Sequence, residues 1–114
     1  MLVVISPAKK LDYESELPAV EPTQPRFFPQ SQILIDQLKT LAPHDISSLM
    51  KISDDLGQLN YDRYHAWQQP FTEENARIAV RAFMGDVYQG LDATNFTEQD
   101  YQFAQNHLRM LSGL

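Results

Sequence analysis

The distribution of apolar and polar positions predicts one short strand followed by several helices. Leu2–Ile5 is an unbroken apolar run, rich in β-branched residues and too short for a helix. Such a run predicts a strand covered on both faces at the centre of an α/β sheet. Pro7 has no amide proton and biases Ser6 toward extended geometry, so the strand is expected to end at Ser6. Lys9 and Lys10 follow at the strand's carboxyl end, where open α/β sheets usually bind ligands.

A proline-rich segment and a first helix follow this strand. Three prolines alternating with glutamates predict an extended surface loop over residues 13–29. Apolar residues then recur at helical spacing from Leu34 to Leu41, and Ser31 is expected to cap this helix. Pro43 marks where the helix is expected to end.

A second helical pattern occupies the middle of the chain. Apolar spacing over residues 46–59 is interrupted at Ser53, which is expected to cap a new helix. Asp54 and Asp55 would lie in its first turn, where carboxylates interact favourably with the helix dipole. We therefore interpret these two acids as dipole partners and not as metal ligands.

The last third of the chain predicts two more helices and contains two ambiguous runs. Thr72 is expected to begin one helix and Thr97 to cap the other, each with acidic residues in the first turn. Met84–Tyr88 is ambiguous between a short strand and a loop. Leu108–Leu111 either continues the last helix or forms a second buried strand.

Together these elements predict an α/β fold, with a mixed α+β arrangement as the alternative. An amino-terminal buried strand would be packed by several helices. The length of 114 residues suits one domain, and no internal repeat divides the chain. The apolar Leu114 after a glycine suggests a chain that is cut at this point, which would make residues 1–114 the amino-terminal part of a larger domain.

Composition narrows the classes of function. Fifteen acidic against nine basic residues give a formal charge of −6, which argues against nucleic-acid binding through the overall field. Binding to nucleic acid would need a local basic patch. The absence of cysteine excludes disulfides and thiolate metal sites in these residues and fits a reducing cytosol. With no signal peptide and no apolar run of membrane-spanning length, we expect a cytoplasmic protein without a membrane partner.

Candidate binding residues occur in two places. Beside Ser6, the adjacent ammonium groups of Lys9 and Lys10 would suit a phosphate, although a solvated loop is the alternative. Residues 38–50 can form two short helices joined by a tight turn, with Lys39 and Lys51 nearby. Such a unit can hold a DNA backbone, and an ordinary helix pair is equally compatible with the pattern.

No catalytic residue, metal site or cofactor is predicted from the residues themselves. His44, His65 and His107 do not pair at a spacing that suits one metal ion. No nucleophile elbow and no glycine-rich phosphate loop is present.

Four runs of the sequence resemble the YaaA family of bacterial peroxide-stress proteins. They are Ile5–Asp12, Met50–Ser53, Phe83–Leu91 and His107–Leu114, in the family's order. Family members are roughly twice as long as this chain, so the resemblance covers an amino-terminal portion.

The resemblance implies a mixed α/β fold with a helix-hairpin-helix element and a basic groove that binds DNA. It also implies a role in keeping unincorporated intracellular iron low under hydrogen peroxide stress. Arg109 lies in a matching run and joins Ser6, Lys9, Lys10, Lys39 and Lys51 as a candidate phosphate contact. Further matching positions, with no individual role implied, are Asp12, Ser53, Asp86, Tyr88, Ser112 and Gly113. Because this chain is acidic, most of the groove is expected to come from the rest of the family protein.

Three functions therefore compete. The first is a stress protein that is not an enzyme and protects DNA by binding its double-stranded or junction forms. The second is an enzyme acting on a nucleotide or another phosphate-bearing molecule, with Ser6 and Lys9 holding the anion and Asp12 or Asp86 as base. Direct iron binding, the third, lacks ligand spacing. The isolated segment is also expected to self-associate through apolar surface on the strand and the last helix.

Overall fold

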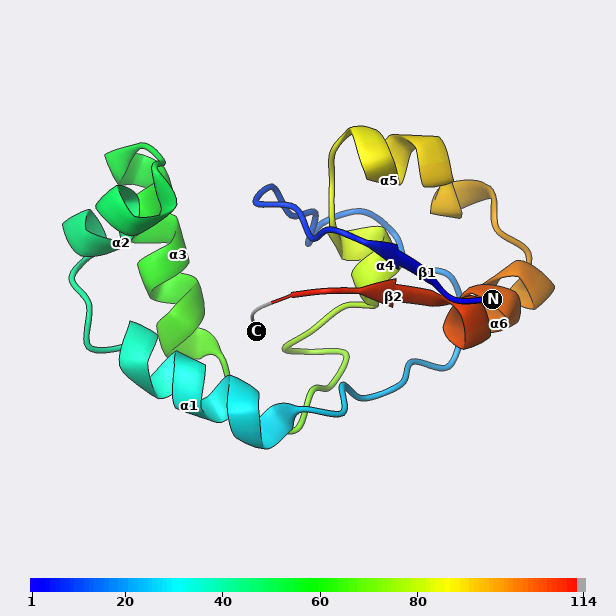
Figure 1. The fold of residues 1–114 in the computed structure, drawn as a ribbon, viewed down its shortest axis with the longest axis horizontal. Helices are drawn as coiled ribbons and strands as arrows, with labels where there is room; N and C mark the ends of the chain where they lie inside the picture. The colour runs from blue at the N-terminus through cyan, green and yellow to red at the C-terminus, as the bar shows by residue number, and fades with distance from the viewer. Residues whose placement is uncertain (113–114) are drawn as a thin grey trace. The chain divides into compact units, whose positions relative to one another are not determined.

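The structure, a computed structural model, describes residues 1–112 (Figure 1). Contacts divide these residues into two units. The α/β unit comprises residues 1–24 and 72–112, and the helical unit comprises residues 25–71. Helices and a small parallel sheet occur together, which confirms the predicted α/β class. Among the described residues, no helix has the length and apolar character needed to cross a membrane.

Two short strands, one near each end of the chain, form the sheet of the α/β unit. Strand β1 (Val3–Ile5) pairs in parallel with β2 (Leu108–Met110), with Val3 opposite Leu108. The backbone N–H of Leu111 extends the pairing by donating to the carbonyl of Ile5 at 3.2 Å. For the ambiguous run at 108–111, the strand alternative is therefore correct, although the strand is half-buried and not buried.

The expectation that Leu2–Ile5 is covered on both faces is wrong for this chain. Leu2 is 56% exposed and Val4 is 50% exposed, and only Ile5 is half-buried. The described residues supply a single partner strand, so the sheet ends at β1 on one side and at β2 on the other. The apolar run correctly predicted a strand but not its burial.

Four short helical elements complete the α/β unit. They are α4 (Ala79–Ala82), α5 (Asp86–Leu91), the 3-10 helix η1 (Ala93–Asn95) and α6 (Glu98–His107). The predicted cap of the last helix is confirmed: the Thr97 hydroxyl accepts from Asp100 N at 3.2 Å, and the Asp100 carboxylate accepts from Thr97 N at 2.8 Å. This reciprocal capping box satisfies two amides at the start of α6.

Two predictions for this unit are wrong. Thr72 begins a single turn and not a helix. Its N–H is bonded to the Asn75 side chain at 2.7 Å, as at the start of a helix, but Arg77 bonds to the carbonyl of Asp12 and the chain is extended again at Ile78. Met84–Tyr88 was expected to be a strand or a loop, but its residues from Asp86 onward belong to helix α5. Gly85, at φ 132°, turns the chain directly into α5.

The helical unit contains α1 (Phe28–Leu38), α2 (Pro43–Met50) and α3 (Asp54–Ala66). Ser53 caps α3 as predicted, because its hydroxyl accepts from Leu56 N at 3.3 Å. Ser31 does not cap α1, which begins three residues earlier with Pro29 in its first turn. Proline is favoured there because its missing N–H would have no helical partner.

Close packing joins α2 to α3. Gly57 of α3 lies so near α2 that an added Cβ would be 1.9 Å from Ser47 Oγ and 2.7 Å from Pro43 O. Ser47 is itself buried, and its hydroxyl donates to Pro43 O at 3.0 Å. Ile46 beside it is 1% exposed. Small residues at this crossing therefore allow the two helices to touch.

Candidate functional site

The segment after β1 is held firmly against the rest of the α/β unit. We call residues 6–16 the strand-end loop. Its backbone forms an isolated antiparallel bridge between Leu11 and Phe83, in which Met84 N donates to Lys10 O at 3.0 Å and Asp12 N donates to Ala82 O at 2.7 Å. Nearer the strand, the Tyr88 hydroxyl donates to the carbonyl of Ser6. The loop is thus fixed before and after its two lysines.

Tyr88 brings two of the predicted motif runs together. It lies on α5 and is 8% exposed, with its ring 5.4 Å from that of Phe83. Burial raises the pKa of the Tyr88 phenol, which keeps the hydroxyl protonated as a donor. Its bond to Ser6 links α5 to the end of β1.

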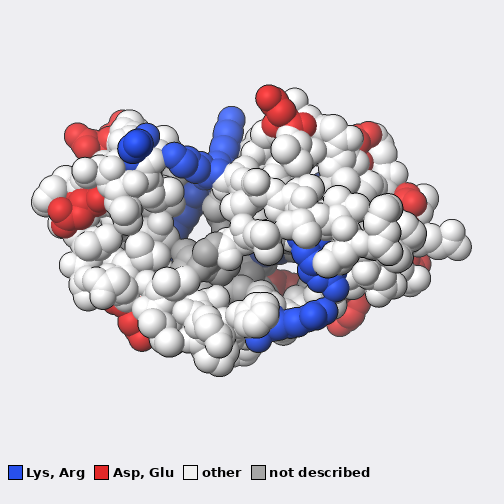
Figure 2. All heavy atoms as spheres, viewed as in Figure 1, with Lys and Arg blue, Asp and Glu red and all other residues white. Residues whose placement is uncertain are grey.

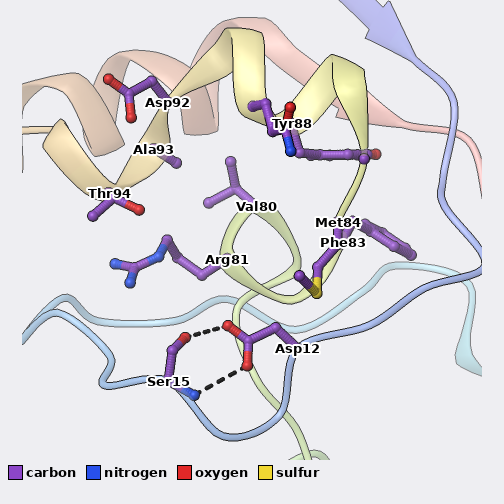
Figure 3. A pocket seen from close by; sticks show the side chains of 12 residues that line it. Asp12, Ser15, Val80, Arg81, Phe83, Met84, Tyr88, Asp92, Ala93 and Thr94 are labelled. Carbon is purple, nitrogen blue, oxygen red and sulfur yellow. Dashed lines mark hydrogen bonds between the residues drawn. The ribbon is translucent and has the colours of Figure 1, made fainter.

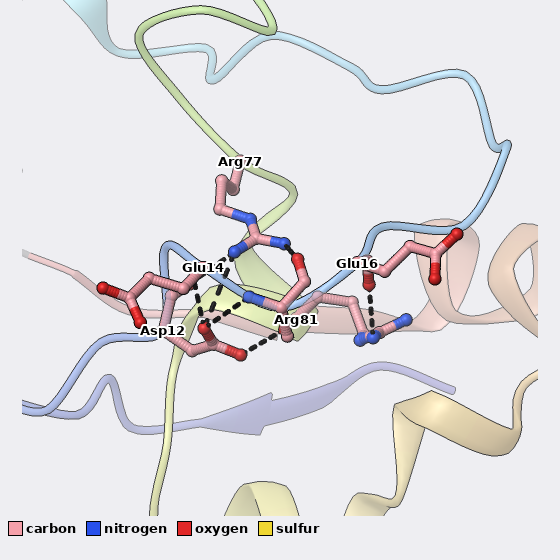
Figure 4. Close-up of polar contacts among 6 residues, drawn as sticks. Asp12, Glu14, Glu16, Arg77 and Arg81 are labelled. Carbon is pink, nitrogen blue, oxygen red and sulfur yellow. Dashed lines mark hydrogen bonds and ion pairs between the residues drawn. The ribbon is translucent and has the colours of Figure 1, made fainter.

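Asp12 organises the second half of the strand-end loop (Figure 4). Its carboxylate accepts from the Ser15 hydroxyl, from Ser15 N at 3.0 Å and from Glu14 N at 2.9 Å. These hydrogen bonds, together with the charge of Arg77, lower the pKa of Asp12 to about 2. At neutral pH this carboxylate is therefore a fixed anion that shapes its own loop.

Two arginines from the segment around α4 hold the loop from the other side. Arg77 Nη1 lies 3.6 Å from the Asp12 carboxylate and donates to Asp12 O at 3.3 Å, while its other nitrogen donates to the carbonyl of Ser15. Arg81 Nη2 donates to Glu16 O at 3.0 Å, and its Nη1 lies 3.4 Å from the Tyr101 hydroxyl. Both guanidinium groups are thereby used to position the loop.

Beside this arrangement lies a hollow of about 460 Å³ in the surface of the α/β unit (Figure 3). Asp12 and Ser15 border it on one side, and residues from α4 to η1 form the remainder. Arg81, Tyr88 and Asp92 are among its polar lining groups. The hollow joins residues that are far apart in the sequence, and it mixes charges of both signs.

The residues predicted to contact phosphate differ in their exposure and in their hydrogen-bond partners. Lys9 and Lys10 are exposed on the strand-end loop. Arg109 lies on β2 opposite Val4, and its Nη1 donates at 2.7 Å to both Gln105 O and Leu108 O. That guanidinium therefore satisfies carbonyls at the carboxyl end of α6.

Lys39 and Lys51 lie in the helical unit. Lys39 ends α1 and is half-buried, whereas Lys51 is exposed and has the left-handed conformation, with φ 55°, between α2 and α3. The predicted pair of helices over residues 38–50 corresponds to the end of α1 and to α2. Asp54 and Asp55 occupy the first turn of α3, as predicted, and make its amino end unattractive to phosphate.

The remaining motif positions are scattered. Asp86 is exposed in the first turn of α5, and Ser53 is occupied as the cap of α3. Ser112 is exposed at the end of the described residues, and Gly113 lies outside them.

Sequence reasoning did not predict the contacts by which Arg77, Arg81 and Ser15 hold the strand-end loop. The spacing of Asp12 and Ser15, three residues apart in a loop, is typical of a side chain that accepts from nearby backbone amides. This spacing was the one feature of the sequence that could have predicted the Asp12–Ser15 contacts. The arginines gave none, because they bond to backbone carbonyls more than sixty positions away.

The histidines form separate local contacts. His44 lies 3.2 Å from the Asp45 carboxylate, the His65 ring is 4.4 Å from Tyr61, and His107 Nδ1 is 2.8 Å from Met1 O. Within residues 1–112, no three acidic or histidine side chains are grouped to hold a metal ion. That the three histidines do not share a metal stays a prediction.

Acidic and basic side chains are distributed differently on the visible face of the molecule. On the face shown in Figure 2, acidic side chains are visible on both units and basic side chains are confined to a few places. With a net charge of −6, attraction of a polyanion would depend on local groups.

Comparison with known proteins gives a consistent result. The sequence model of a family described as "Peroxide stress protein YaaA" matches residues 1–114. The chain is 59% identical over its whole length to a "UPF0246 protein" of Teredinibacter turnerae and 59% identical to one of Saccharophagus degradans. A "UPF0246 protein" of Colwellia psychrerythraea is 54% identical. The chain spans 44% of the length of each of these curated relatives.

Proposed function

This chain belongs to the peroxide stress protein YaaA family, and on that premise we propose that it binds DNA backbone phosphates through Lys9 and Lys10. In this proposal the cytoplasmic full-length protein shields double-stranded or junction DNA during peroxide stress, and it keeps free iron low. The observation that carries the proposal is the exposed lysine pair on a loop fixed at both ends. Fixed loops lose little conformational entropy when a ligand binds.

The surroundings of the lysines support an anion as the ligand. Asp12, the acid nearest to them in sequence, is paired with Arg77 and accepts three hydrogen bonds within its own loop. Its charge is therefore largely compensated and subtracts little from the field of the two ammonium groups. Glu14 and Glu16 are exposed further along the loop. The rest of a basic groove would have to come from other parts of the full-length protein.

The enzyme hypothesis is less well supported. It required Asp12 or Asp86 as a base, and a carboxylate with a pKa of about 2 accepts a proton poorly at neutral pH. Asp86 is exposed at the start of α5, without a described partner to activate it. Direct iron binding by residues 1–112 is also left out of the proposal, since no three acidic or histidine side chains in that range are grouped to hold a metal ion.

The proposal is tested with the full-length protein on duplex and junction DNA over a series of salt concentrations. We expect Lys9→Ala combined with Lys10→Ala to weaken binding equally for unrelated sequences, because backbone contacts carry no base information. The slope of log K against log salt should become shallower by about one to two units, since each lost phosphate contact removes about one released counterion.

Arg26→Ala is the control for the double lysine variant, because it removes an exposed positive charge outside the strand-end loop. We expect the control to leave the salt slope unchanged within about 0.3 units, since it lies outside the loop. An unchanged slope in the double lysine variant would remove the strand-end loop from the DNA-binding surface. Loss of turnover of a phosphate-bearing molecule with unchanged DNA affinity would favour the enzyme hypothesis.

A further inference from the structure

Apolar side chains on both faces of strand β1 are exposed, which is uncommon in parallel sheets. Parallel strands occur almost only where both faces of the sheet are covered. Here Val4 of β1 is 50% exposed, and Leu2, which directly precedes the strand and lies on the same face by alternation, is 56% exposed. Val3 on the opposite face is 43% exposed. The apolar residues that make β1 a strand are therefore poorly buried by residues 1–112.

The outer edge of β1 is open as well. Leu111 N donates to Ile5 O, so the backbone polar groups of Ile5 point toward β2. Backbone groups of successive residues in a strand point to opposite edges, so those of Val4 point away from β2. Among the described residues no strand pairs with that edge. β2 is half-buried along its whole length, which makes the β1 side the more exposed one.

The relatives indicate what could occupy this surface. Residues 1–114 correspond to 44% of each relative's length, so the remainder of a relative is longer than the matched part. A further parallel strand needs a crossover connection of about a dozen residues or more, and the remainder provides ample length. Covalent linkage also gives that remainder a high effective concentration at the sheet, which a second copy of the protein lacks.

We propose that the part of the full-length family protein outside residues 1–114 adds a strand to the open edge of β1 at Val4. The same part covers the apolar face formed by Leu2 and Val4. A helical occupant would cover the face without satisfying the edge. The two statements, one about a backbone amide and one about a side chain, are therefore tested separately.

Hydrogen exchange of the unmodified full-length protein tests the edge. We expect the amide of Val4 to exchange at least about 100-fold more slowly than an unstructured amide. The same protection is expected for the amide of Ile5, which already faces β2. An unprotected Val4 amide beside a protected Ile5 amide would overturn the added strand. This measurement needs no variant and cannot be confused by misfolding.

Cysteine labelling tests the face. Val4→Cys is compared with Val87→Cys on α5, because the two valines are 50% and 52% exposed and residues 1–114 contain no cysteine. Any cysteines elsewhere in the full-length protein are replaced by serine, and each rate is normalised to that of the same variant in urea. In the full-length monomer we expect the Val4→Cys thiol to react with a maleimide about 100-fold more slowly than the Val87→Cys thiol.

Two results would overturn the covered face. One is reaction of the Val4→Cys thiol in the full-length monomer at its unfolded rate. The other is protection that disappears on dilution, which would identify a second copy as the occupant. Neither result bears on the salt dependence of DNA binding, so this inference and the proposed function can fail independently.

Discussion

At the scale of single residues, Asp12 shows how one carboxylate can fix a loop without being buried deeply. Its side chain is 25% exposed, yet it accepts from two backbone amides and one hydroxyl and faces Arg77, whose side chain is 8% exposed. Each of these contacts favours the ionised form, which is why its pKa falls to about 2. The negative charge is thus a structural part of the strand-end loop.

This predicts a specific dependence of stability on pH. A carboxylate whose pKa is lower in the folded than in the unfolded protein stabilises the fold above its unfolded pKa, here about 3.8. That contribution is lost as pH falls from about 4 through about 2. Urea unfolding between pH 5 and pH 2 should therefore show a steeper loss of stability for the unmodified protein than for Asp12→Asn.

The control for Asp12→Asn is Glu21→Gln, which alters an exposed acid in the proline-rich segment. Its stability curve should run parallel to that of the unmodified protein over the same pH range. If Asp12→Asn also ran parallel, the loop would not depend on the ionised carboxylate.

The sequence predicted part of this site. Asp12 lay in a motif run, and Ser6, Lys9 and Lys10 were expected at the end of the strand, where the structure places them. Arg77 could not be predicted, because it recognises the carbonyls of Asp12 and Ser15, and a backbone carbonyl leaves no mark on the residue type. For Arg109, the position was predicted but its contacts with the carbonyls of α6 were not.

At the scale of elements, helix caps formed by neighbouring residues were predicted well, whereas the effects of contacts between distant segments were not. Ser53 and Thr97 cap their helices as expected, because the capping signal lies within four consecutive residues. Thr72 has the same type of capping residue and acidic first turn, but no helix follows it. There the Asn75 side chain accepts from Thr72 N as in a capping box, but Arg77 in the following segment bonds to the strand-end loop and the chain is extended at Ile78.

The contact between α2 and α3 leads to a prediction about Gly57. An alanine there would place its Cβ 1.9 Å from Ser47 Oγ and 2.7 Å from the backbone oxygen of Pro43, so the helices would have to separate. We expect Gly57→Ala to destabilise the helical unit by about 1–3 kcal/mol despite the better helix propensity of alanine. Urea unfolding followed by circular dichroism measures this loss.

Gly90→Ala is the matched control, because Gly90 lies in α5 with nothing within 4 Å of the added Cβ. Alanine is better than glycine in a helix by up to about 1 kcal/mol, so this variant should be neutral or slightly stabilised. Equal behaviour of the two glycine variants would mean that α2 and α3 can move apart without cost.

At the scale of the whole molecule, the described residues bury few large side chains. The buried apolar residues are Ile35, Ile46, Ala82, Tyr88 and Ala93. Val4 on β1, Leu2 directly before it and Phe103 on α6 are exposed, which agrees with the expected apolar surface on the strand and the last helix. The sequence shows which positions are apolar. It does not show which other residues, within or beyond this chain, cover them.

We therefore predict that the 114-residue chain alone self-associates through β1. The open edge and exposed valines of a short strand favour pairing with another chain, and lysine on an edge opposes it. Val4→Lys should weaken association at least about tenfold, because pairing would bury a charge without a partner. Val87→Lys, which places the same charge at a similarly exposed valine on α5, should leave association unchanged. Sedimentation across a concentration series measures both variants, and a monodisperse, cooperatively melting monomer of the unmodified chain would show that the open strand does not mediate association.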